Sequence, residues 1–345
     1  MLIVMTVGAS PEDVARVTAQ IEALGLRAHP IPGAQRTAIG ITGNRESLNP
    51  AVFETLPGVL EVIPVSHPYK LVSREVKPEP TVVDVGGVPV GGGHFAVFAG
   101  PCAVEDAEQT MTIARAVRAA GAHVLRGGAY KPRTSPYAFQ GLGRPGLEIL
   151  RDVSREVGLP VVSEALDEAS LELVVEYCDM IQVGARSMQN FPLLRACGRQ
   201  RKPVLIKRGM AATIEELLMA AEYVLAEGNY QVVLCERGIR TFANHTRNTL
   251  DLAAVVATQR LSHLPIIVDP SHGTGKRHKV IPLGRAAAAV GADGVMIEVH
   301  HNPARALSDG SQAVLPDELA EFVRQLPILL PLTGRHLAEF RPAAR

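Results

Sequence analysis

Eight short apolar runs between residues 95 and 301 constrain the fold of this chain more than any other feature. Amphipathic helical patterns separate or follow them, and continuous apolar runs are typical of parallel strands that are buried on both faces. Eight β/α units in about 235 residues fit a closed (β/α)8 TIM barrel better than an open doubly wound sheet. The runs are FAVFAG, HVLRGG, PVVSEA, MIQVGA, PVLIKRG, QVVLCERG, PIIVDPSH and GVMIEVHH.

The segment before the barrel predicts a small α+β unit with the order strand, helix, strand, strand, helix, strand. Ser10 is the expected N-cap of the first helix and Pro11 its first residue, and a second helix is expected from Pro50 to Leu56. The four strands are LIVMTV, RAHPIP, RTAIGIT and VLEVIPV. This order indicates a ferredoxin-like split βαβ fold.

The predicted domain boundaries follow from these two patterns. We expect a ferredoxin-like regulatory domain in residues 1–66, a linker in 67–80, the catalytic barrel in 81–331 and a tail in 332–345. The polar, proline-containing stretch SREVKPEP reads as the linker. The sequence VVDVGGVPVGGG after it predicts a short hairpin of the kind that can plug the base of a barrel.

Composition narrows the class of protein. The 345 residues include 35 basic and 35 acidic side chains, so net charge gives no argument for a nucleic-acid or membrane partner. The apolar start MLIVMTVG lacks the basic region of a signal peptide, and we expect a cytoplasmic protein. Four cysteines without CxxC spacing indicate neither a disulfide framework nor a cysteine zinc cluster. Any metal must therefore use mixed ligands.

Polar residues end or follow nearly every predicted strand, where a TIM barrel carries its active site. From the first strand to the eighth they are Cys102, Arg126, Glu164, Arg186, Lys207 with Arg208, Glu236 with Arg237, Asp269 with His272, and Glu298. One such residue would mean little. Their convergence on one end of a barrel predicts a site.

Four of the residues at this end are candidate metal ligands. Cys102, His272, Glu298 and Asp309 come from the first, seventh and eighth units, which are neighbours in a closed barrel. A thiolate, an imidazole and two carboxylates suit Mn²⁺, Fe²⁺, Co²⁺ or Zn²⁺ better than Mg²⁺ or Ca²⁺. Taken singly, each also fits an ordinary structural role, such as a small buried thiol or a turn aspartate.

The basic residues at the same end predict bound anions. They are Arg126, Lys131, Arg133, Arg186, Lys207 and Arg237. Burying so many like charges is costly without anions between them, and guanidinium groups bind phosphate or carboxylate bidentately. Salt bridges to Glu164, Glu236 and Asp269 are the alternative explanation. The loop KPRTSPYAFQGLG after the second strand has the cations and hydroxyls of a phosphate-binding loop, although it could also be a surface loop.

Seven motifs along the barrel resemble those of 3-deoxy-D-arabino-heptulosonate 7-phosphate (DAHP) synthases. They are GPCAVE, LRGGAYKPRTSPYAFQGLG, QVGARSMQN, LIKRGM, CERGIRTF, DPSHGTG and IEVHHNP. The resemblance covers roughly residues 80–330. The N-terminal unit resembles the ferredoxin-like, ACT-like regulatory domain of one branch of this family. The resemblance implies condensation of phosphoenolpyruvate with erythrose 4-phosphate, the first step of the shikimate pathway.

The resemblance also implies roles for individual residues. Cys102, His272, Glu298 and Asp309 match ligands of one divalent metal ion. Arg133 and Thr134 match the site of the erythrose 4-phosphate phosphate. Seven further matches surround phosphoenolpyruvate: Arg126, Lys131, Glu164, Ala185, Arg186, Lys207 and Arg237. Lys131 is expected to act as a proton donor or an electrostatic stabiliser, and Asp269 is expected to bind substrate.

Two other functions stay open at this point. The sister synthase that makes 3-deoxy-D-manno-octulosonate 8-phosphate shares the barrel, but its loop typically carries a KANRSS-like motif where this chain has KPRTS. A non-catalytic amino-acid sensor is the alternative of another class. The resemblance further implies a homotetramer or homodimer and feedback by tyrosine or phenylalanine.

Overall fold

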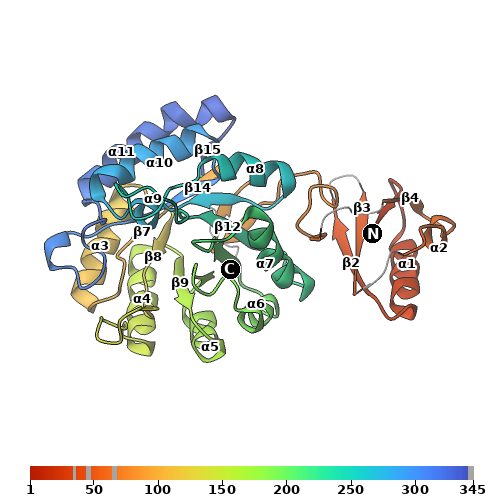
Figure 1. The fold of residues 1–345 in the computed structure, drawn as a ribbon, viewed down its shortest axis with the longest axis horizontal. Helices are drawn as coiled ribbons and strands as arrows, with labels where there is room; N and C mark the ends of the chain where they lie inside the picture. Colours follow the sequence, from red (N-terminus) through yellow and green to blue (C-terminus); the bar gives the residue numbers. More distant parts are fainter. Residues whose placement is uncertain (34–35, 44–47, 64–67, 341–345) are drawn as a thin grey trace.

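The computed structural model describes residues 1–33, 36–43, 48–63 and 68–340, which form a small N-terminal domain beside a large barrel (Figure 1). The small domain contains β1 (Leu2–Met5), α1 (Pro11–Ala23), β2 (Arg27–Pro32), β3 (Thr37–Thr42), α2 (Ala51–Glu54) and β4 (Val59–Ile63). Its sheet has the order β2-β3-β1-β4 with every neighbouring pair antiparallel. The predicted ferredoxin-like fold is confirmed.

Helix α1 begins where the sequence predicts. The Ser10 side chain accepts a hydrogen bond from the Asp13 N–H, and the Asp13 carboxylate accepts one from the Ser10 N–H in return. The buried face of α1, with Val17 and Ile21, packs on the sheet residues Ile39 and Ile41. Helix α2 is shorter than the predicted segment, and Pro64 and Val65 of the predicted fourth strand lie outside the described residues.

Eight parallel strands form a closed barrel, as the sequence predicts. They are β7 (His94–Gly100), β8 (Val124–Arg126), β9 (Val161–Ala165), β10 (Met180–Val183), β11 (Val204–Lys207), β12 (Val232–Glu236), β13 (Ile266–Val268) and β14 (Gly294–Glu298). Neighbours in sequence are neighbours in the sheet, and β14 pairs with β7 from Gly294↔Ala96 to Glu298↔Gly100, which closes the ring. All eight carboxyl ends therefore face the same mouth.

Helices cover the outside of the barrel, and each strand is followed by at least one (Figure 1). They are α3 (Ala107–Ala119), α4 (Arg144–Val157), α5 (Glu168–Tyr177), α6 (Phe191–Gly198), α7 (Ile214–Ala226), α8 (Ala253–Leu261), α9 (Pro270–Thr274), α10 (Arg277–Ala289) and α11 (Pro316–Leu329). Two short 3₁₀ turns, η1 (Pro303–Arg305) and η2 (Leu330–Thr333), complete the helical elements. No helix among the described residues is long and apolar enough to cross a membrane.

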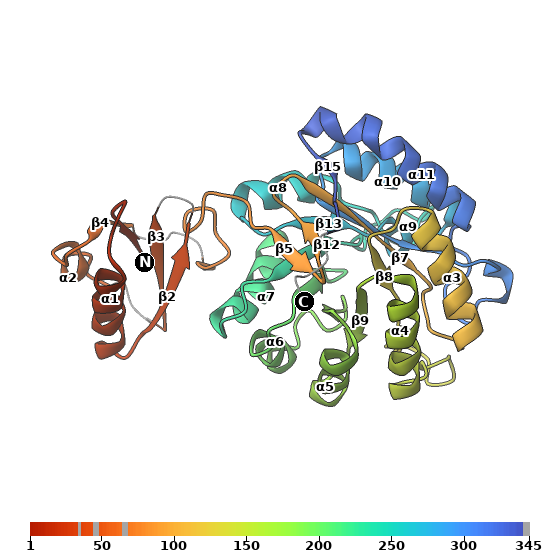
Figure 2. The same cartoon turned by 180° about the vertical axis from the view of Figure 1, so that it is seen from behind.

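The predicted hairpin closes the amino-terminal end of the barrel. It consists of β5 (Val83–Val85) and β6 (Val88–Val90), which pair antiparallel directly before β7. Its four valines are fully buried in one cluster with interior residues of the barrel strands, among them Val233 and Ile267. Figure 2 shows β5 beside β12 and β13. Apolar packing at this end leaves the opposite mouth as the open one.

The segment between the two domains is more ordered than its composition predicts. Tyr69, Leu71, Val72 and Val76 are buried in the same core cluster as barrel residues. The buried carboxylate of Glu222 in α7 accepts three consecutive backbone N–H groups of residues 70–72 at 2.9–3.1 Å. A carboxylate with three N–H donors is well satisfied when buried. These contacts fix the segment to the barrel, while the domain boundaries stay a prediction.

The end of the chain also returns to the barrel. Strand β15 (His336–Leu337) pairs in parallel with the start of β7. Ala338 is buried in the cluster that holds the hairpin valines. Residues 336–338 of the predicted tail thus pack at the closed end, and residues 341–345 lie outside the described residues.

Candidate active site

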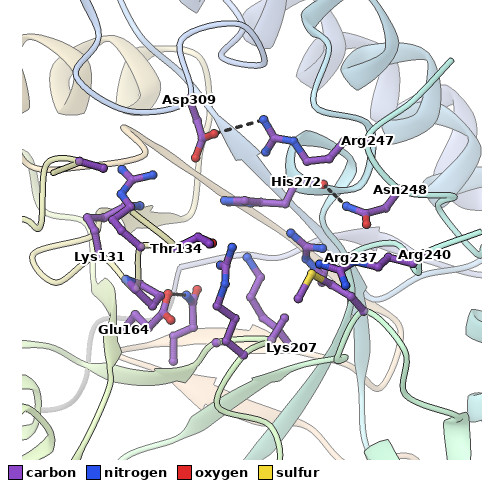
Figure 3. Close-up of a pocket in the computed structure, with 18 of the residues that line it drawn as sticks. Lys131, Thr134, Glu164, Lys207, Arg237, Arg240, Arg247, Asn248, His272 and Asp309 are labelled. Carbon is purple, nitrogen blue, oxygen red and sulfur yellow. Dashed lines mark hydrogen bonds and ion pairs between the residues drawn. The ribbon is translucent and has the colours of Figure 1, made fainter. Parts of the chain in front are cut away.

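A polar cavity of about 450 Å³ opens at the carboxyl ends of the barrel strands (Figure 3). Most of the residues predicted from the sequence line it: Arg126, Lys131, Arg133, Thr134, Glu164, Ala185, Arg186, Lys207, Arg237, His272 and Asp309. The remaining three, Cys102, Glu298 and Asp269, are buried and are not among the residues that line it. The closed barrel therefore brings the predicted set together, because all of these residues end or follow strands at the same mouth.

The four candidate metal ligands form one cluster at the side of this cavity. One donor atom from each of Cys102, His272, Glu298 and Asp309 lies within 4.8 Å of the others. Cys102 follows β7, His272 lies in α9 after β13, and Glu298 ends β14, so three adjacent strands supply them. Sulfur, nitrogen and oxygen donors at this spacing suit a divalent transition metal. The donor set and its geometry fit the predicted metal.

Asp269 orients the imidazole of His272. Its Oδ1 accepts the His272 N–H at 2.9 Å as the N-cap of α9, and its Oδ2 lies 2.7 Å from His272 Nδ1. The other ring nitrogen, Nε2, then faces Glu298 Oε1 at 3.1 Å. This is the carboxylate–histidine arrangement that holds metal-binding histidines in one orientation.

Asp269 does not line the cavity, and its predicted contact with substrate stays a prediction. The side chain is fully buried behind Lys207, whose Nζ donates to Asp269 Oδ2 at 2.5 Å, and it is not among the residues that line the cavity. Strand β13 also ends at Val268, earlier than the predicted run, because Asp269 and Pro270 begin α9. Asp269 thus acts on His272 and Lys207 in this arrangement.

The charges in this network stabilise one another. Burial disfavours the charged form of His272, yet Asp269 and Glu298 outweigh burial and raise the pKa of His272 to about 10. Burial likewise opposes ionisation of Asp269, but His272 and Lys207 hold its pKa well below the usual range. The pKa of Glu298 is lowered for the same reason, with His272 as the main partner. Without metal, Asp269 and Glu298 are therefore carboxylates and His272 is an imidazolium near neutral pH.

Lys131 and Arg126 lie against the metal cluster. Lys131 Nζ donates to the Cys102 carbonyl at 2.9 Å and contacts Cys102 Sγ at 3.0 Å. Arg126 donates to the Pro101 carbonyl at 2.6 Å and to Glu298 Oε1 at 3.1 Å, while its Nε is buried without a partner. Both cations therefore border the metal site as well as the cavity.

Salt bridges account for only part of the positive charge. Lys207 pairs with Asp269, and Arg208 pairs with Glu236 and Asp251. Among the described residues, however, Arg237 has no ion pair, although it is only 7% exposed and its Nη1 is buried without a hydrogen-bond partner. Burial lowers the pKa of Arg237 below its usual value. A buried, unpaired guanidinium facing a cavity indicates an anionic ligand.

Glu164 owes its position to a glycine. Its Oε2 accepts a hydrogen bond from Gln182 Nε2 at 2.9 Å, and its Oε1 fills the space beside Gly184. A Cβ added at Gly184 would lie 1.9 Å from Glu164 Oε1, which no real contact allows. The bare backbone after β10 therefore makes room for a carboxylate from β9.

Gly184→Ala is expected to displace Glu164 and to lower kcat/KM on the order of 10²-fold, because a misplacement of about 1 Å in an active site has that effect. Steady-state kinetics would measure it. Gly209→Ala is the matched control, since a Cβ there would come no closer than 3.3 Å to the atoms around it. Unchanged kinetics of Gly184→Ala would contradict a functional position for Glu164.

The sequence analysis missed several residues of the site. Arg240, Arg247 and Asn248 line the cavity from the loop after β12, where the basic residues of CERGIR offered a signal. Ser308 contacts Cys102 Sγ at 3.1 Å and accepts a hydrogen bond from Arg133 Nη2. The buried Gln312 donates to Glu298 Oε2 at 2.5 Å. The two Ser308 contacts join residues far apart in sequence, so no local pattern reveals them.

Family models match nearly the whole chain. Residues 74–329 match the model of the DAHP synthetase I family. The chain belongs to this family. Residues 1–67 match the model of the DAHP synthase ferredoxin-like domain, in agreement with the observed topology. Family members use phosphoenolpyruvate and erythrose 4-phosphate and are generally metal-dependent.

The chain is more similar to a named heptonate aldolase than to a named octonate aldolase. The chain is 51% identical to the phospho-2-dehydro-3-deoxyheptonate aldolase of Thermotoga maritima over 97% of this chain and 99% of that protein. A 2-dehydro-3-deoxyphosphooctonate aldolase of Syntrophotalea carbinolica is 33% identical over 72% of this chain and 95% of its own length. The first match includes the N-terminal domain, and the second is more distant.

Solved structures give the same result. The crystal structure of the Thermotoga maritima aldolase (DAHP synthase) superimposes with a TM-score of 0.77 at 50% identity, covering 97% of this chain and 98% of that one. A truncated form of the same synthase covers 78% of this chain and 99% of its own, with a TM-score of 0.73. The predicted fold class and family are therefore confirmed.

Proposed function

We propose that this chain condenses phosphoenolpyruvate with D-erythrose 4-phosphate and water to give 3-deoxy-D-arabino-heptulosonate 7-phosphate and phosphate. It is a 3-deoxy-7-phosphoheptulonate synthase and supplies the first step of the shikimate pathway to aromatic amino acids. The observation that carries this proposal is the buried Arg237, which has no ion pair among the described residues, in a cavity that Arg126, Lys131 and Arg186 also line. Two multiply charged substrates would neutralise this excess of cations.

Each anionic group has a proposed set of partners. Arg186 and Arg237 hold the phosphate of phosphoenolpyruvate, and Arg126 and Lys207 lie on or near its carboxylate. Arg133 and Thr134 hold the phosphate of erythrose 4-phosphate. Glu164 and Ala185 border the phosphoenolpyruvate site. Much of the catalysis is then the positioning of two anions that would otherwise repel each other.

The reaction follows from this placement. C3 of phosphoenolpyruvate attacks C1 of the aldehyde, water adds at C2, and collapse of the hemiketal phosphate breaks the C–O bond and releases phosphate. Lys131 stands between the cavity and Cys102, where its ammonium group can donate a proton or stabilise negative charge. A divalent cation bound by the four-residue cluster would supply Lewis-acid stabilisation of the aldehyde oxygen.

The metal is proposed to be Mn²⁺, Fe²⁺, Co²⁺ or Zn²⁺. Cys102, His272, Glu298 and Asp309 would hold it, with Asp269 fixing the ring of His272. A mixed set of one sulfur, one nitrogen and two oxygen donors accepts each of these ions. We also propose that the protein is a homotetramer or a homodimer, as the family resemblance implies.

Metal affinity is expected to rise with pH. The pKa of His272 is raised to about 10 without metal, so a bound cation must displace a proton at every lower pH. One displaced proton gives about a tenfold gain in apparent affinity per pH unit. Calorimetric titration of the metal-free protein with Co²⁺ at about pH 6 and about pH 8 would measure the gain. Equal affinity at both pH values would contradict a proton on His272.

The N-terminal domain is proposed to mediate feedback by tyrosine or phenylalanine. Deleting residues 1–66 is expected to abolish inhibition, because it removes the proposed effector domain. The barrel should stay catalytic, because the backbone N–H groups of residues 70–72 still bind the Glu222 carboxylate. Inhibition curves of full-length and shortened enzyme would test this. Deleting residues 1–80 is the comparison, and it should lower stability because Glu222 loses three N–H donors. Normal inhibition of the shorter chain would contradict the regulatory role.

One experiment tests the catalytic proposal directly. Phosphoenolpyruvate consumption is followed with erythrose 4-phosphate or arabinose 5-phosphate, each with Mn²⁺ and with excess EDTA. Metal-dependent turnover of erythrose 4-phosphate alone supports the proposal. Turnover with only arabinose 5-phosphate would identify the octulosonate synthase instead, and no turnover with either would favour an amino-acid sensor.

A further inference from the structure

Asp309 has an unusual backbone among the described residues. It is the only non-glycine residue there with a positive φ, at 54°. The left-handed region is unfavourable for residues with a Cβ, although aspartate tolerates it better than most. Its carbonyl accepts the Gln312 N–H at 3.0 Å, which fixes the turn that follows. Because the backbone of Asp309 is fixed in this turn, the orientation of its carboxylate depends on the contacts of the side chain.

The two oxygens of Asp309 serve different partners. Oδ2 lies 3.3 Å from Cys102 Sγ, on the side of the candidate metal ligands. Oδ1 accepts a hydrogen bond from Arg247 Nη2 at 3.2 Å (Figure 3). One oxygen is thus held by a guanidinium while the other faces the cluster.

Arg247 is itself held in place. Its backbone N–H donates to the Thr274 carbonyl at 2.9 Å. Its side chain lies against the bare backbone of Gly275, where an added Cβ would come within 2.7 Å of Arg247 Nε. Thr274 is the last residue of α9, the helix that carries His272, and Gly275 is its C-cap. The guanidinium that contacts Asp309 is therefore tied to the segment of another metal ligand.

We propose that Arg247 is a positioning residue that turns Asp309 Oδ2 toward the metal. The inference rests on the proposed metal site and adds a residue that touches none of the donor atoms facing the ion. Hydrogen bonds to the outer oxygen of a ligating carboxylate typically raise metal affinity 10- to 100-fold. Repulsion between the guanidinium and the cation acts in the opposite direction, but the Arg247 side chain is 39% exposed, so water screens its charge. Orientation therefore outweighs repulsion.

Co²⁺ binding to metal-free protein tests the proposal without relying on turnover. Arg247→Ala is expected to weaken Co²⁺ affinity by about 10- to 100-fold and to alter the ligand-field absorption, while the thiolate-to-Co²⁺ band from Cys102 persists. Arg247→Lys keeps the charge without the fork and should give an intermediate affinity. Arg240→Ala is the matched control, because Arg240 lines the same cavity from the same loop and does not contact Asp309.

The outcomes separate this inference from the metal site itself. If the unsubstituted protein binds no Co²⁺, the metal site is wrong and the inference with it. If that protein binds one Co²⁺ and Arg247→Ala binds it equally or more tightly with the same spectrum, only the role of Arg247 is wrong. Should Arg247→Ala fail to fold in a thermal unfolding scan, the comparison of Arg247→Lys with the unsubstituted protein decides, and equal affinity overturns the proposal.

Discussion

Arg237→Met is expected to lower kcat/KM for phosphoenolpyruvate by roughly 10²- to 10⁴-fold and to leave the free energy of unfolding unchanged or higher. Arg237 is buried and has no anionic partner among the described residues, so substrate would supply the missing charge. Losing one member of a buried charge pair costs about 3–5 kcal/mol. Applied to the pair of Arg237 and the bound substrate, this free energy corresponds to the expected decrease in kcat/KM. Without substrate, methionine removes an uncompensated buried cation.

Arg208→Met is the matched comparison for Arg237→Met. Arg208 is equally buried at the end of the neighbouring strand, but it pairs with Glu236 at 2.9 Å and with Asp251 at 3.0 Å. Its replacement leaves buried Glu236 without its main partner and should destabilise the fold by about 3–5 kcal/mol. Steady-state kinetics and urea unfolding of both variants would measure the contrast. Equal destabilisation by the two would show that Arg237 serves the fold.

Cys102→Ser is expected to weaken binding of the divalent metal on the order of 10²-fold or more. Removing a residue that only hydrogen-bonds to a metal ligand typically lowers metal affinity 10- to 100-fold, and losing a ligand should cost more. A neutral hydroxyl is a poorer ligand than a thiolate. Turnover should fall at limiting metal and recover in part at high metal concentration. Calorimetry with Co²⁺ and activity as a function of added Mn²⁺ would measure both effects.

Cys197→Ala provides the control for the cysteine substitution. Cys197 is buried in α6 away from the ligand cluster, and burial raises the pKa of its thiol to about 12, so it stays neutral and unsuited to a metal. Metal affinity of this variant should equal that of the unsubstituted protein. Full activity of Cys102→Ser at limiting metal would contradict the proposed ligand set.

Local sequence patterns were sufficient for the elements and for most of the site. The eight apolar runs predicted β7–β14, and Ser10 with Pro11 predicted the start of α1, because strand burial and helix capping depend on nearby residues. The rule that active sites lie at the carboxyl ends of barrel strands then predicted which side chains meet.

Only the tertiary structure decided which partners those side chains have. The sequence by itself determined two domain folds, a barrel mouth rich in cations, and a sulfur, nitrogen and oxygen donor set. It did not separate Arg237 from Arg208, place Asp269 behind Lys207, or join Arg247 to Asp309 across 62 positions of sequence. It also did not predict that the backbone N–H groups of residues 70–72 donate to the buried carboxylate of Glu222. The spacing of apolar residues indicates which face of a single helix or strand is buried. Ion pairs and buried contacts between elements depend instead on how the barrel closes.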